Sequence, residues 1–297
     1  MLIYITEPGE IHKKAIDLLQ ENNHKVTFKG EPANKIEAVF IRSYTRIDKG
    51  FLNSFPNLKF VLRVGVGLDN IDIDECKKRG IQIINAAGSN ANAVAELVVC
   101  LILMLLRNVM NQNLLLKKGE WRDKKFMGEE LKNKTIGFVG CGAIARQVAE
   151  KVLPFKIKEI LGYDPYLNEE TLAGYKIKKV ELNYLIKHAD IISFHLPLTS
   201  ETKNLISMNE LKKMKKNSYI INTSRGGIVN ENDLIVALQG KIVAGAALDV
   251  FENEPKIKKE FLSLENIILT PHIGAYTFES DYEMSLEPVR KFLLLLK

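Results

Sequence analysis

The chain of 297 residues predicts an α/β protein made of two doubly wound parallel-sheet domains. Short apolar runs alternate with helical patterns in two separate series, and one long apolar helical pattern divides them. Strands that alternate with helices indicate parallel sheets covered by helices on both faces. The length is sufficient for two hydrophobic cores, so each series is expected to form its own domain.

The first series occupies the first 85 residues. Its helical pattern Ile11–Asn22 places Ile11, Ala15, Leu18 and Leu19 on one face. Five short apolar runs are predicted strands: Leu2–Ile5, Val26–Phe28, Ala38–Ile41, Phe60–Leu62 and Ile81–Ile84.

A helical pattern over Asn90–Arg107 separates the two series. It is apolar almost all round, which predicts a helix buried between two bodies. Its apolar run Leu97–Leu106 is about half of the roughly 20 residues that a membrane span requires, and Glu96 and Arg107 bracket it. We therefore expect no membrane span.

The second series predicts six strands, which make a complete dinucleotide-binding sheet if they are parallel and separated by helices. These strands are Thr135–Val139, Glu159–Tyr163, Ile191–Phe194, Tyr219–Asn222, Gly245–Leu248 and Ile267–Leu269. A last helical pattern, Asp281–Lys297, ends in apolar residues that are expected to pack on the first domain. The predicted domains are therefore residues 1–88 with 276–297, and residues 89–275.

Composition excludes several classes of protein. Apolar residues make up 46% of the chain and charged residues 26%, which excludes an intrinsically disordered protein. Cys76, Cys100 and Cys141 are an odd number without a CxxC pair, so neither a disulfide framework nor a zinc site is expected. A reducing cytoplasm suits such cysteines best. The net charge of +6 is spread along the chain, which suits an anionic metabolite and does not predict nucleic-acid binding.

A glycine-rich turn is the first candidate for binding a ligand. Gly140-Cys141-Gly142-Ala143-Ile144-Ala145 follows one predicted strand and opens a predicted helix, Ile144–Val152. This is the G-x-G-x-x-G/A pattern, in which glycines permit a tight turn and let the backbone approach a pyrophosphate at a helix N-terminus.

Asp164 ends the strand after that turn. A carboxylate at this place binds the adenosine ribose hydroxyls of a dinucleotide, and no Arg or Lys adjoins Asp164 in sequence to receive a 2′-phosphate. The pattern predicts NAD as the cofactor in preference to NADP. A tight turn in an unrelated α/β protein is the alternative interpretation.

Three polar side chains follow three consecutive predicted strands of the second series. Arg225, Glu254 and His272 are expected to converge, because ligands of parallel sheets bind outside the carboxyl ends of the strands. His272 suits a general base for a hydroxyl proton, Glu254 would hold the ring, and Arg225 would clamp a carboxylate. Taken singly, each has an equally good structural interpretation. Arg225 would be a surface arginine, Glu254 one more acid in an acidic loop, and His272 a residue that caps a strand.

Other chemistries find less support. His195 also ends a strand and is expected to line a cofactor cleft without taking part in chemistry. The sequence has neither an HExxH pattern nor a Cys/His cluster, so no metal is predicted. Ser224 is not in a nucleophile elbow, which disfavours a hydrolase.

The motifs together resemble the D-isomer-specific 2-hydroxyacid dehydrogenases over nearly the whole chain. They are Gly140 to Ala145, His195-Leu196-Pro197-Leu198-Thr199, Asn222-Thr223-Ser224-Arg225-Gly226-Gly227, Ala247-Leu248-Asp249-Val250-Phe251 and Pro271-His272-Ile273-Gly274-Ala275. The resemblance implies a Rossmann NAD-binding domain inserted in a discontinuous flavodoxin-like substrate domain. It also implies that Arg225 binds substrate, His272 is the acid/base and Glu254 orients it.

The resemblance further implies cofactor contacts and a partner. The cofactor contacts would come from Val66, Gly140, Gly142, Ala143, Ile144, Asp164, Leu196, Thr223, Ser224, Asp249, Gly274 and Ala275. The family is typically dimeric, and Asn90–Arg107 with the segment near Trp121 resembles its dimerisation region. We therefore expect a homodimer acting on a small anionic hydroxy acid.

Within the family, the chain is most similar to the members that oxidise 3-phospho-D-glycerate in the first step of serine synthesis. The similar segments are Ile41–Ser43, Arg63–Asp72 and Trp121–Gly128. A substrate with both a carboxylate and a phosphate needs extra cations. The implied substrate-binding residues are Arg42, Ser43, Arg63, Val64 and Gly65.

Several alternatives stay open. Arg42 and Arg63 are equally interpretable as surface charges, in which case a reductase of glyoxylate, hydroxypyruvate or another 2-keto acid is favoured. A non-enzymatic NAD-sensing protein, similar to the corepressors related to this family, is a third hypothesis. The sequence departs from the family at Ala145, where a third glycine is usual, and at Tyr276, where serine is usual. It ends after the catalytic body, so feedback by serine through a C-terminal domain is not expected.

Overall fold

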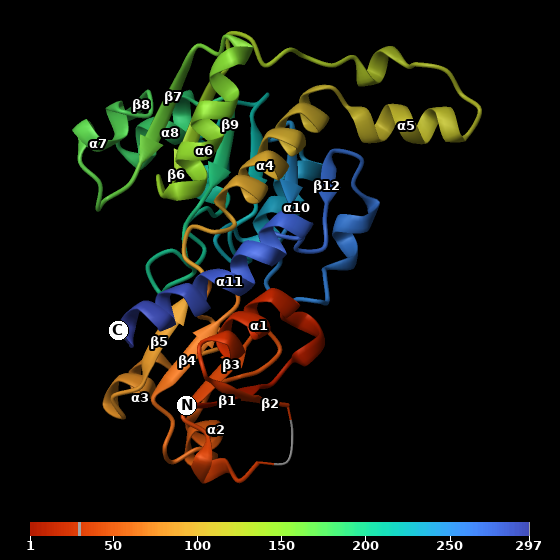
Figure 1. Ribbon diagram of the computed structural model, residues 1–297. Helices are drawn as coiled ribbons and strands as arrows, with labels where there is room; N and C mark the ends of the chain where they lie inside the picture. Colours follow the sequence, from red (N-terminus) through yellow and green to blue (C-terminus); the bar gives the residue numbers. More distant parts are fainter. Residues whose placement is uncertain (29–30, 297) are drawn as a thin grey trace. The chain divides into compact units, whose positions relative to one another are not determined.

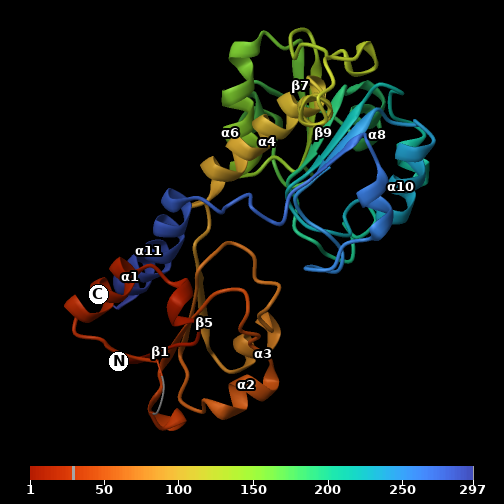
Figure 2. The same ribbon diagram turned by 90° about the vertical axis from the view of Figure 1, so that its right-hand side faces the viewer.

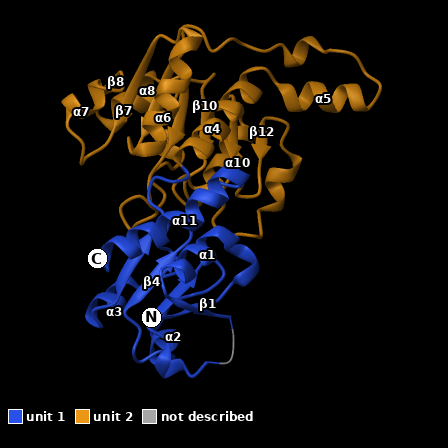
Figure 3. Ribbon diagram, viewed as in Figure 1, with its two compact units in different colours: residues 1–90, 275–297 blue, residues 91–274 orange. Residues whose placement is uncertain are grey.

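The computed structural model describes residues 1–28 and 31–296, and it divides into two compact units (Figure 3). Unit 1 comprises residues 1–90 and 275–297, and unit 2 comprises residues 91–274. Each unit contains one parallel sheet with helices on both faces, which confirms the predicted fold class.

The described residues of unit 1 form a five-stranded sheet in the order β2-β1-β3-β4-β5 (Figure 1). This is the flavodoxin-like order of a doubly wound fold. The strands are β1 (Leu2–Ile5), β2 (Lys25–Thr27), β3 (Ala38–Ile41), β4 (Phe60–Arg63) and β5 (Gln82–Asn85). The helices are α1 (Lys13–Glu21), α2 (Lys49–Ser54), α3 (Ile73–Lys78) and α11 (Phe278–Leu295).

Helices lie on the two faces of this sheet (Figure 2), and a hydrophobic core lies between the sheet and the helices on each face. Ala38 and Phe40 of β3 face α1 and α11, whereas Val39 and Ile41 face α2 and α3. Both faces of the sheet are therefore buried at β3, which explains why this strand is apolar throughout and does not alternate between apolar and polar residues. The helix α11 starts at Phe278, before the predicted Asp281, because the Thr277 side chain caps it. The predicted last residue, Lys297, lies outside the described residues.

All of unit 2 is described, and its sheet has seven strands in the order β12-β11-β10-β9-β6-β7-β8. The chain order reverses between β6 and β9, which is the switch point where such sheets bind ligands. The strands are β6 (Thr135–Val139), β7 (Glu159–Tyr163), β8 (Ile177–Lys179), β9 (Ile191–Phe194), β10 (Tyr219–Asn222), β11 (Gly245–Leu248) and β12 (Ile267–Leu269). The helices are α4 (Ala91–Leu106), α5 (Val109–Lys117), α6 (Ala143–Val152), α7 (Glu169–Ala173), α8 (Leu182–His188), α9 (Met208–Leu211) and α10 (Glu231–Gln239).

The strand β8 was not predicted, because it is a short edge strand in which only Ile177 is buried. Within unit 2 the apolar helix α4 packs against α6 and against β10, β11 and β12. Short 3₁₀ helices complete the secondary structure: Pro8–Glu10, Ala33–Lys35, Lys124–Phe126, Leu153–Phe155 and Lys259–Ser263.

In the part of the chain that the structure describes, no single helix is both long and apolar enough to cross a membrane. Taken together, α4 and α5 are long and apolar enough for a span by length and composition alone, but the two helices are bent by 64° relative to each other. The helix α5 extends away from the sheet of unit 2 (Figure 1) and has no buried residue.

Candidate active site

Loops that follow three adjacent strands carry the predicted catalytic residues. Arg225 follows β10, Glu254 follows β11 and His272 follows β12, and these strands are neighbours in the sheet of unit 2. Parallel strands end at the same edge, so the fold brings the three loops together.

His272 and Glu254 form a hydrogen-bonded pair. Nδ1 of His272 lies 2.7 Å from Oε2 of Glu254, and Oε1 of Glu254 accepts from the amide of Phe251 at 3.0 Å. The hydrogen bond to Glu254 raises the pKa of His272 above its ordinary value, against the effect of burial. Burial opposes ionisation of Glu254, but the hydrogen bonds from His272 and Phe251 hold the pKa of that carboxyl below its ordinary value. The pair therefore favours a ring that donates from Nδ1 and keeps Nε2 for a ligand.

A buried carboxylate anchors the segment that carries His272. Oδ1 of Asp249 accepts from the hydroxyl of Thr270 (2.6 Å) and the amide of Ile273 (2.8 Å), and Oδ2 accepts from the amide of Gly274 (2.8 Å). Asp249 is fully buried, and its carbonyl accepts from the amide of His272. Asp249 and Gly274, which the sequence predicted as cofactor contacts, thus take part in hydrogen bonds that flank His272, whose backbone has a left-handed φ of 54°.

The side chain of Asn222 shapes the turn that carries Arg225. Its Oδ1 accepts from the amide (3.1 Å) and the hydroxyl (2.8 Å) of Ser224, and its Nδ2 donates to the carbonyl of Arg225 (2.9 Å). The Arg225 guanidinium donates to the carbonyl of Ser224 at 2.7 Å. The positive charge of Arg225 adds to the lowering of the Glu254 pKa. It opposes, without cancelling, the rise in the His272 pKa that Glu254 causes. Sequence reasoning missed Asn222 as a site residue, although a polar residue at the end of a buried strand was a usable signal.

The glycine turn has the geometry that a pyrophosphate requires. Gly140 has φ of 87°, and a Cβ there would lie 2.5 Å from the carbonyl oxygen of His195. At Gly142, the first residue before α6, the described chain has no atom within 4 Å of the position that a Cβ would take, and no side chain caps the helix. Open space thus adjoins the free N–H groups of a helix N-terminus, where Ala143 is exposed and Ile144 half-buried.

Asp164 links this turn to the end of β7. Oδ2 accepts from the amide of Cys141 at 2.9 Å, and Oδ1 accepts from the amides of Tyr166 and Leu167 at 2.9 Å and 3.2 Å. A cavity of about 480 Å³ opens beside the last residue of the same strand, Tyr163. Its other lining residues are Glu181, Leu182, Asn183, Ile186, Lys187, Glu210 and Lys213.

Unsatisfied polar atoms lie at the same edge of the sheet. Among residues 1–28 and 31–296, Oγ1 of Thr223 and both ring nitrogens of His195 are buried without a hydrogen-bond partner. Burial lowers the pKa of His195 to about 3, so the ring is neutral. Buried polar atoms normally have partners, and these follow β9 and β10 beside the switch point. A dinucleotide is a ligand that fits the open turn, the carboxylate and these atoms.

At the carboxyl edge of unit 1, Arg63 and Arg42 are held by Asn70. Nε of Arg63 donates to Oδ1 of Asn70 (3.3 Å), and Nδ2 of Asn70 donates to the carbonyl of Arg42 (2.9 Å). The Arg42 guanidinium donates to Oδ1 of Asp281 at 2.7 Å and to the carbonyl of Glu10 at 2.6 Å. The phosphate-binding role predicted for Arg42 therefore competes with an existing ion pair.

Glycine is required beside Arg63. Gly65 has φ of 124°, and a Cβ on it would lie 2.5 Å from NH1 of Arg63. Among the other predicted residues of unit 1, Ser43 is exposed, Val64 is buried, and Val66 is 38% exposed with its carbonyl bonded by Asn85. Ala275 packs on the core of unit 1, and Leu196 of unit 2 is half-buried.

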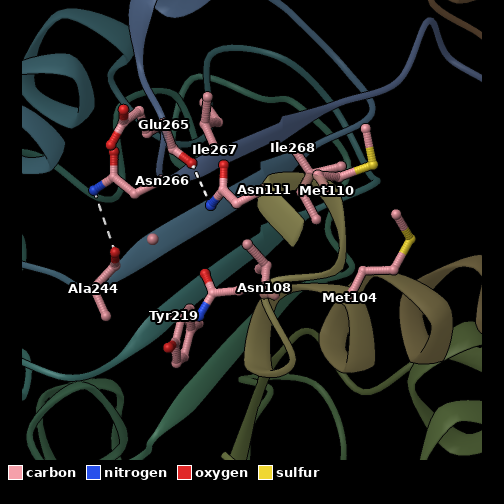
Figure 4. A pocket seen from close by; sticks show the side chains of 12 residues that line it. Met104, Asn108, Met110, Asn111, Tyr219, Ala244, Glu265, Asn266, Ile267 and Ile268 are labelled. Atoms are coloured by element: carbon pink, nitrogen blue, oxygen red, sulfur yellow. Dashed lines mark hydrogen bonds between the residues drawn. The ribbon is translucent and has the colours of Figure 1, made fainter. Parts of the chain in front are cut away.

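A second, small pocket of unit 2 lies at the opposite edge of its sheet (Figure 4). Tyr219, Gly245 and Ile267, the first residues of β10, β11 and β12, line it together with the end of α4 and the start of α5. It holds about 50 Å³, and none of the predicted site residues borders it. This pocket therefore has no part in the predicted site, whose residues of unit 2 follow the carboxyl ends of the strands.

Comparison with known proteins shows the family to which the chain belongs. The family model "D-isomer specific 2-hydroxyacid dehydrogenase, NAD binding domain" matches residues 99–274, so unit 2 contains the NAD-binding domain of an oxidoreductase. The chain belongs to the D-isomer specific 2-hydroxyacid dehydrogenase family, which confirms the predicted family and cofactor.

Individual relatives differ in their substrates. The hydroxypyruvate reductase of Thermotoga maritima is 36% identical over 97% of this chain and 96% of its own length. The D-3-phosphoglycerate dehydrogenase of Archaeoglobus fulgidus is also 36% identical over 96% of this chain, which spans 55% of that protein. The D-lactate dehydrogenase of Aquifex aeolicus, solved with NAD and lactic acid, has a TM-score of 0.86 at 29% identity and covers 100% of this chain and 95% of its own.

Proposed function

We propose that His272, Glu254 and Arg225 catalyse the oxidation of a D-2-hydroxy acid to a 2-keto acid. The observation that carries this proposal is the 2.7 Å pair of His272 and Glu254, whose loops follow β12 and β11, beside β10, whose following loop carries Arg225. Nε2 of His272 takes the hydroxyl proton, and the carboxylate of Glu254 stabilises the imidazolium that forms. The guanidinium of Arg225 binds the substrate carboxylate and polarises the carbonyl that develops.

The residues of the glycine turn and of the neighbouring strand ends would hold NAD. When bound, NAD accepts the hydride that leaves the hydroxyl-bearing carbon, so a hydroxy acid and NAD give a keto acid, NADH and one proton. Gly140, Gly142, Ala143 and Ile144 suit the pyrophosphate, and Asp164 suits the ribose hydroxyls. Thr223 offers a buried hydroxyl without a protein partner among the described residues. The remaining proposed contacts are Val66, Leu196, Ser224, Asp249, Gly274 and Ala275.

The proposed substrate is 3-phospho-D-glycerate, oxidised to 3-phosphohydroxypyruvate at the start of serine synthesis. Arg63, which is 9% exposed, is hydrogen-bonded to Asn70 and has room beside Gly65, supplies a cation held in place at the carboxyl edge of unit 1. Guanidinium groups that are held in place bind phosphate more strongly than mobile ones, because less side-chain entropy is lost. The resemblance of this segment to D-3-phosphoglycerate dehydrogenases supports the same substrate.

A second candidate activity is the reduction of hydroxypyruvate or glyoxylate. The ion pair of Arg42 with Asp281 favours it, because a guanidinium that already has a carboxylate partner is less available for a phosphate. The hydroxypyruvate reductase of Thermotoga maritima is as similar to this chain as the phosphoglycerate dehydrogenase is.

Kinetics with matched phosphorylated and unphosphorylated substrates test this choice. We expect R63Q to raise the KM for phosphoglycerate by about 10-fold or more, because it removes a charged hydrogen-bond donor, and to leave the KM for glycerate unchanged. Arg79, which pairs with Glu75 on α3, provides the control variant R79Q. Equal effects of R63Q on both substrates would reject the phosphate role. If no 2-hydroxy acid yields NADH, the catalytic proposal fails and the NAD-sensing hypothesis gains.

We also propose that the partner is a second copy of this chain. In the arm formed by residues 109–127, exposed apolar side chains follow one another: Val109, Met110, Leu114, Leu116, Trp121 and Met127. Within unit 2, the side chains of Asn111 and Lys125 donate hydrogen bonds from this arm to Glu265, just before β12. Such a surface suits a homodimer interface. The double variant L116K/M127K is expected to convert a dimer to a monomer in sedimentation velocity, and a monomeric wild type would reject the proposal.

A further inference from the structure

A pair of carboxylates holds the loop that carries Glu254. The amide of Glu252 donates to Oε1 of Glu231 at 2.7 Å, and the amide of Glu231 donates to Oε1 of Glu252 at 3.4 Å. Glu231 is the first residue of α10 and is 4% exposed. The pair therefore ties the start of a helix to the loop after β11.

Lys258 compensates the charge of these two acids. Its Nζ lies 3.8 Å from Oε2 of Glu231 and 3.6 Å from Oε2 of Glu252, and it donates to Oδ1 of Asn232 at 2.6 Å. Burial raises the pKa of Glu231, and the charges of Glu252 and Glu254 raise it further, against Lys258 and the Glu252 amide. Burying an acid beside two other acids costs free energy, so Glu231 is expected to have a role beyond the favourable charge that it places at a helix N-terminus.

The peptide between Phe251 and Glu252 also touches the loop that carries Arg225. A Cβ on Gly226 would lie 2.0 Å from the carbonyl carbon of Phe251 and 2.4 Å from the amide nitrogen of Glu252. The amide of Phe251, in turn, donates to Glu254. The peptide unit Phe251–Glu252 therefore contacts Glu231 and the backbone beside Arg225, and the preceding peptide unit, through the amide of Phe251, contacts the carboxylate that pairs with His272.

We propose that Glu231 is a positioning residue, which sets Glu254 against His272 and beside Arg225 by holding the amide of Glu252. This inference rests on the proposed catalytic roles of those three residues. Small displacements of reacting groups cost large factors in rate, so an acceptor at this amide acts on turnover and not on cofactor binding.

Two variants separate the position of the acceptor atom from its charge. E231Q keeps an oxygen at the distance of Oε1, whereas E231D keeps the charge and withdraws the oxygen by about one methylene group. We expect E231D to lower kcat for a D-2-hydroxy acid by about 10-fold with the KM for NAD within about 2-fold, and E231Q to retain most of kcat. E210D is the control, because Glu210 also accepts a backbone amide near a helix start but bonds only Ser207 and Lys213 among the described residues.

The outcomes are distinct. Full kcat in E231D, or equal losses in E231D and E210D, would overturn the inference. Equal losses in E231D and E231Q would also overturn it, because an oxygen kept at the position of Oε1 would then not preserve turnover. H272N in the same assay tests the foundation: if H272N keeps full turnover, the proposed catalytic site fails, whereas a loss in H272N alone rejects only the role of Glu231.

Discussion

Nδ1 of His272 lies 2.7 Å from Oε2 of Glu254, although the two residues are 18 positions apart in the chain. The contact requires a loop after β11 and a loop after β12 to meet. The carboxylate of Asp249 accepts from the amide of Ile273, and the amide of Phe251 donates to Glu254, which holds the two loops. A pH-sensitive group is thus attached to a fixed carboxylate, and this relationship leads to the first prediction.

E254Q should shift the pH dependence of turnover to lower pH. Glu254 raises the pKa of His272 above its ordinary value of 6.5, and glutamine would accept the Nδ1 hydrogen without stabilising the imidazolium by charge. Oxidation needs the neutral ring of His272, so the acid limb of the pH profile for oxidation should move to lower pH. Reduction needs the protonated ring, so its activity should be lost at a lower pH than in the wild type. Profiles of kcat/KM in both directions check this.

Opposite shifts in the two directions, or unchanged limbs in both, would contradict the assignment of His272 as the titrating group. E210Q, which changes an acid on α9, is the control and should leave both limbs in place.

R225K should weaken binding of the hydroxy acid without affecting the cofactor. Lysine keeps the charge but lacks the planar fork that binds a carboxylate through two hydrogen bonds. Losing one charged hydrogen bond costs about 1.5–3 kcal/mol, so we expect the KM for the hydroxy acid to rise by roughly 10-fold to 100-fold. Steady-state kinetics with NAD varied separately checks this, and an unchanged substrate KM would remove Arg225 from the substrate site.

D164S should weaken NAD binding and narrow the preference for NAD over NADP. The carboxylate of Asp164 accepts hydrogen bonds from the amides of Cys141 and Tyr166. Its negative charge would repel the 2′-phosphate of NADP. We expect the KM for NAD to rise about 10-fold, as for a lost charged hydrogen bond, with less effect on the KM for NADP. D190S is the control, because Asp190 accepts the amide of Thr135 at the other edge of the sheet. If D164S affects NAD and NADP equally, the carboxylate does not select the cofactor.

G226A should abolish most activity and lower stability. A Cβ at this position would lie 2.0 Å from the carbonyl carbon of Phe251, so the loops carrying Arg225 and Glu254 must separate. Overpacking of this kind costs about 1–3 kcal/mol. Thermal unfolding and kcat measure both effects. G174A is the control, because the nearest atom to its Cβ would be 3.5 Å away, and a G226A protein that matches it in activity would show that the loops do not depend on their close contact.

Much of unit 2 could be predicted from the sequence. The six strands β6, β7, β9, β10, β11 and β12 lie at the predicted residues, because strands buried on both faces are continuous apolar runs with polar ends. The strand β8 has three residues, of which one is a buried isoleucine and two are lysines, so its pattern was too weak to predict a strand. Arg225, Glu254 and His272 were found because each directly follows such a strand.

The partners of the supporting residues were beyond the reach of sequence reasoning. Asn222 could have been noticed as a polar residue that ends a predicted strand, but its partners could not be inferred, and the amide that Glu231 holds is 21 positions away. The partner of Arg42 is Asp281, 239 positions along the chain. Patterns of neighbouring residues indicate elements and their ends, whereas these hydrogen bonds depend on which loops the fold brings together.

The most direct test is NADH formation from the D and L isomers of a 2-hydroxy acid by the wild type and by H272N. Asparagine tolerates the left-handed backbone at this position and still donates to Glu254, so the fold should be kept. We predict NADH from the D isomer in the wild type and a loss of about 100-fold to 10,000-fold in H272N, with NADH binding intact. Undiminished turnover in H272N would contradict the proposal that these three residues form the catalytic site.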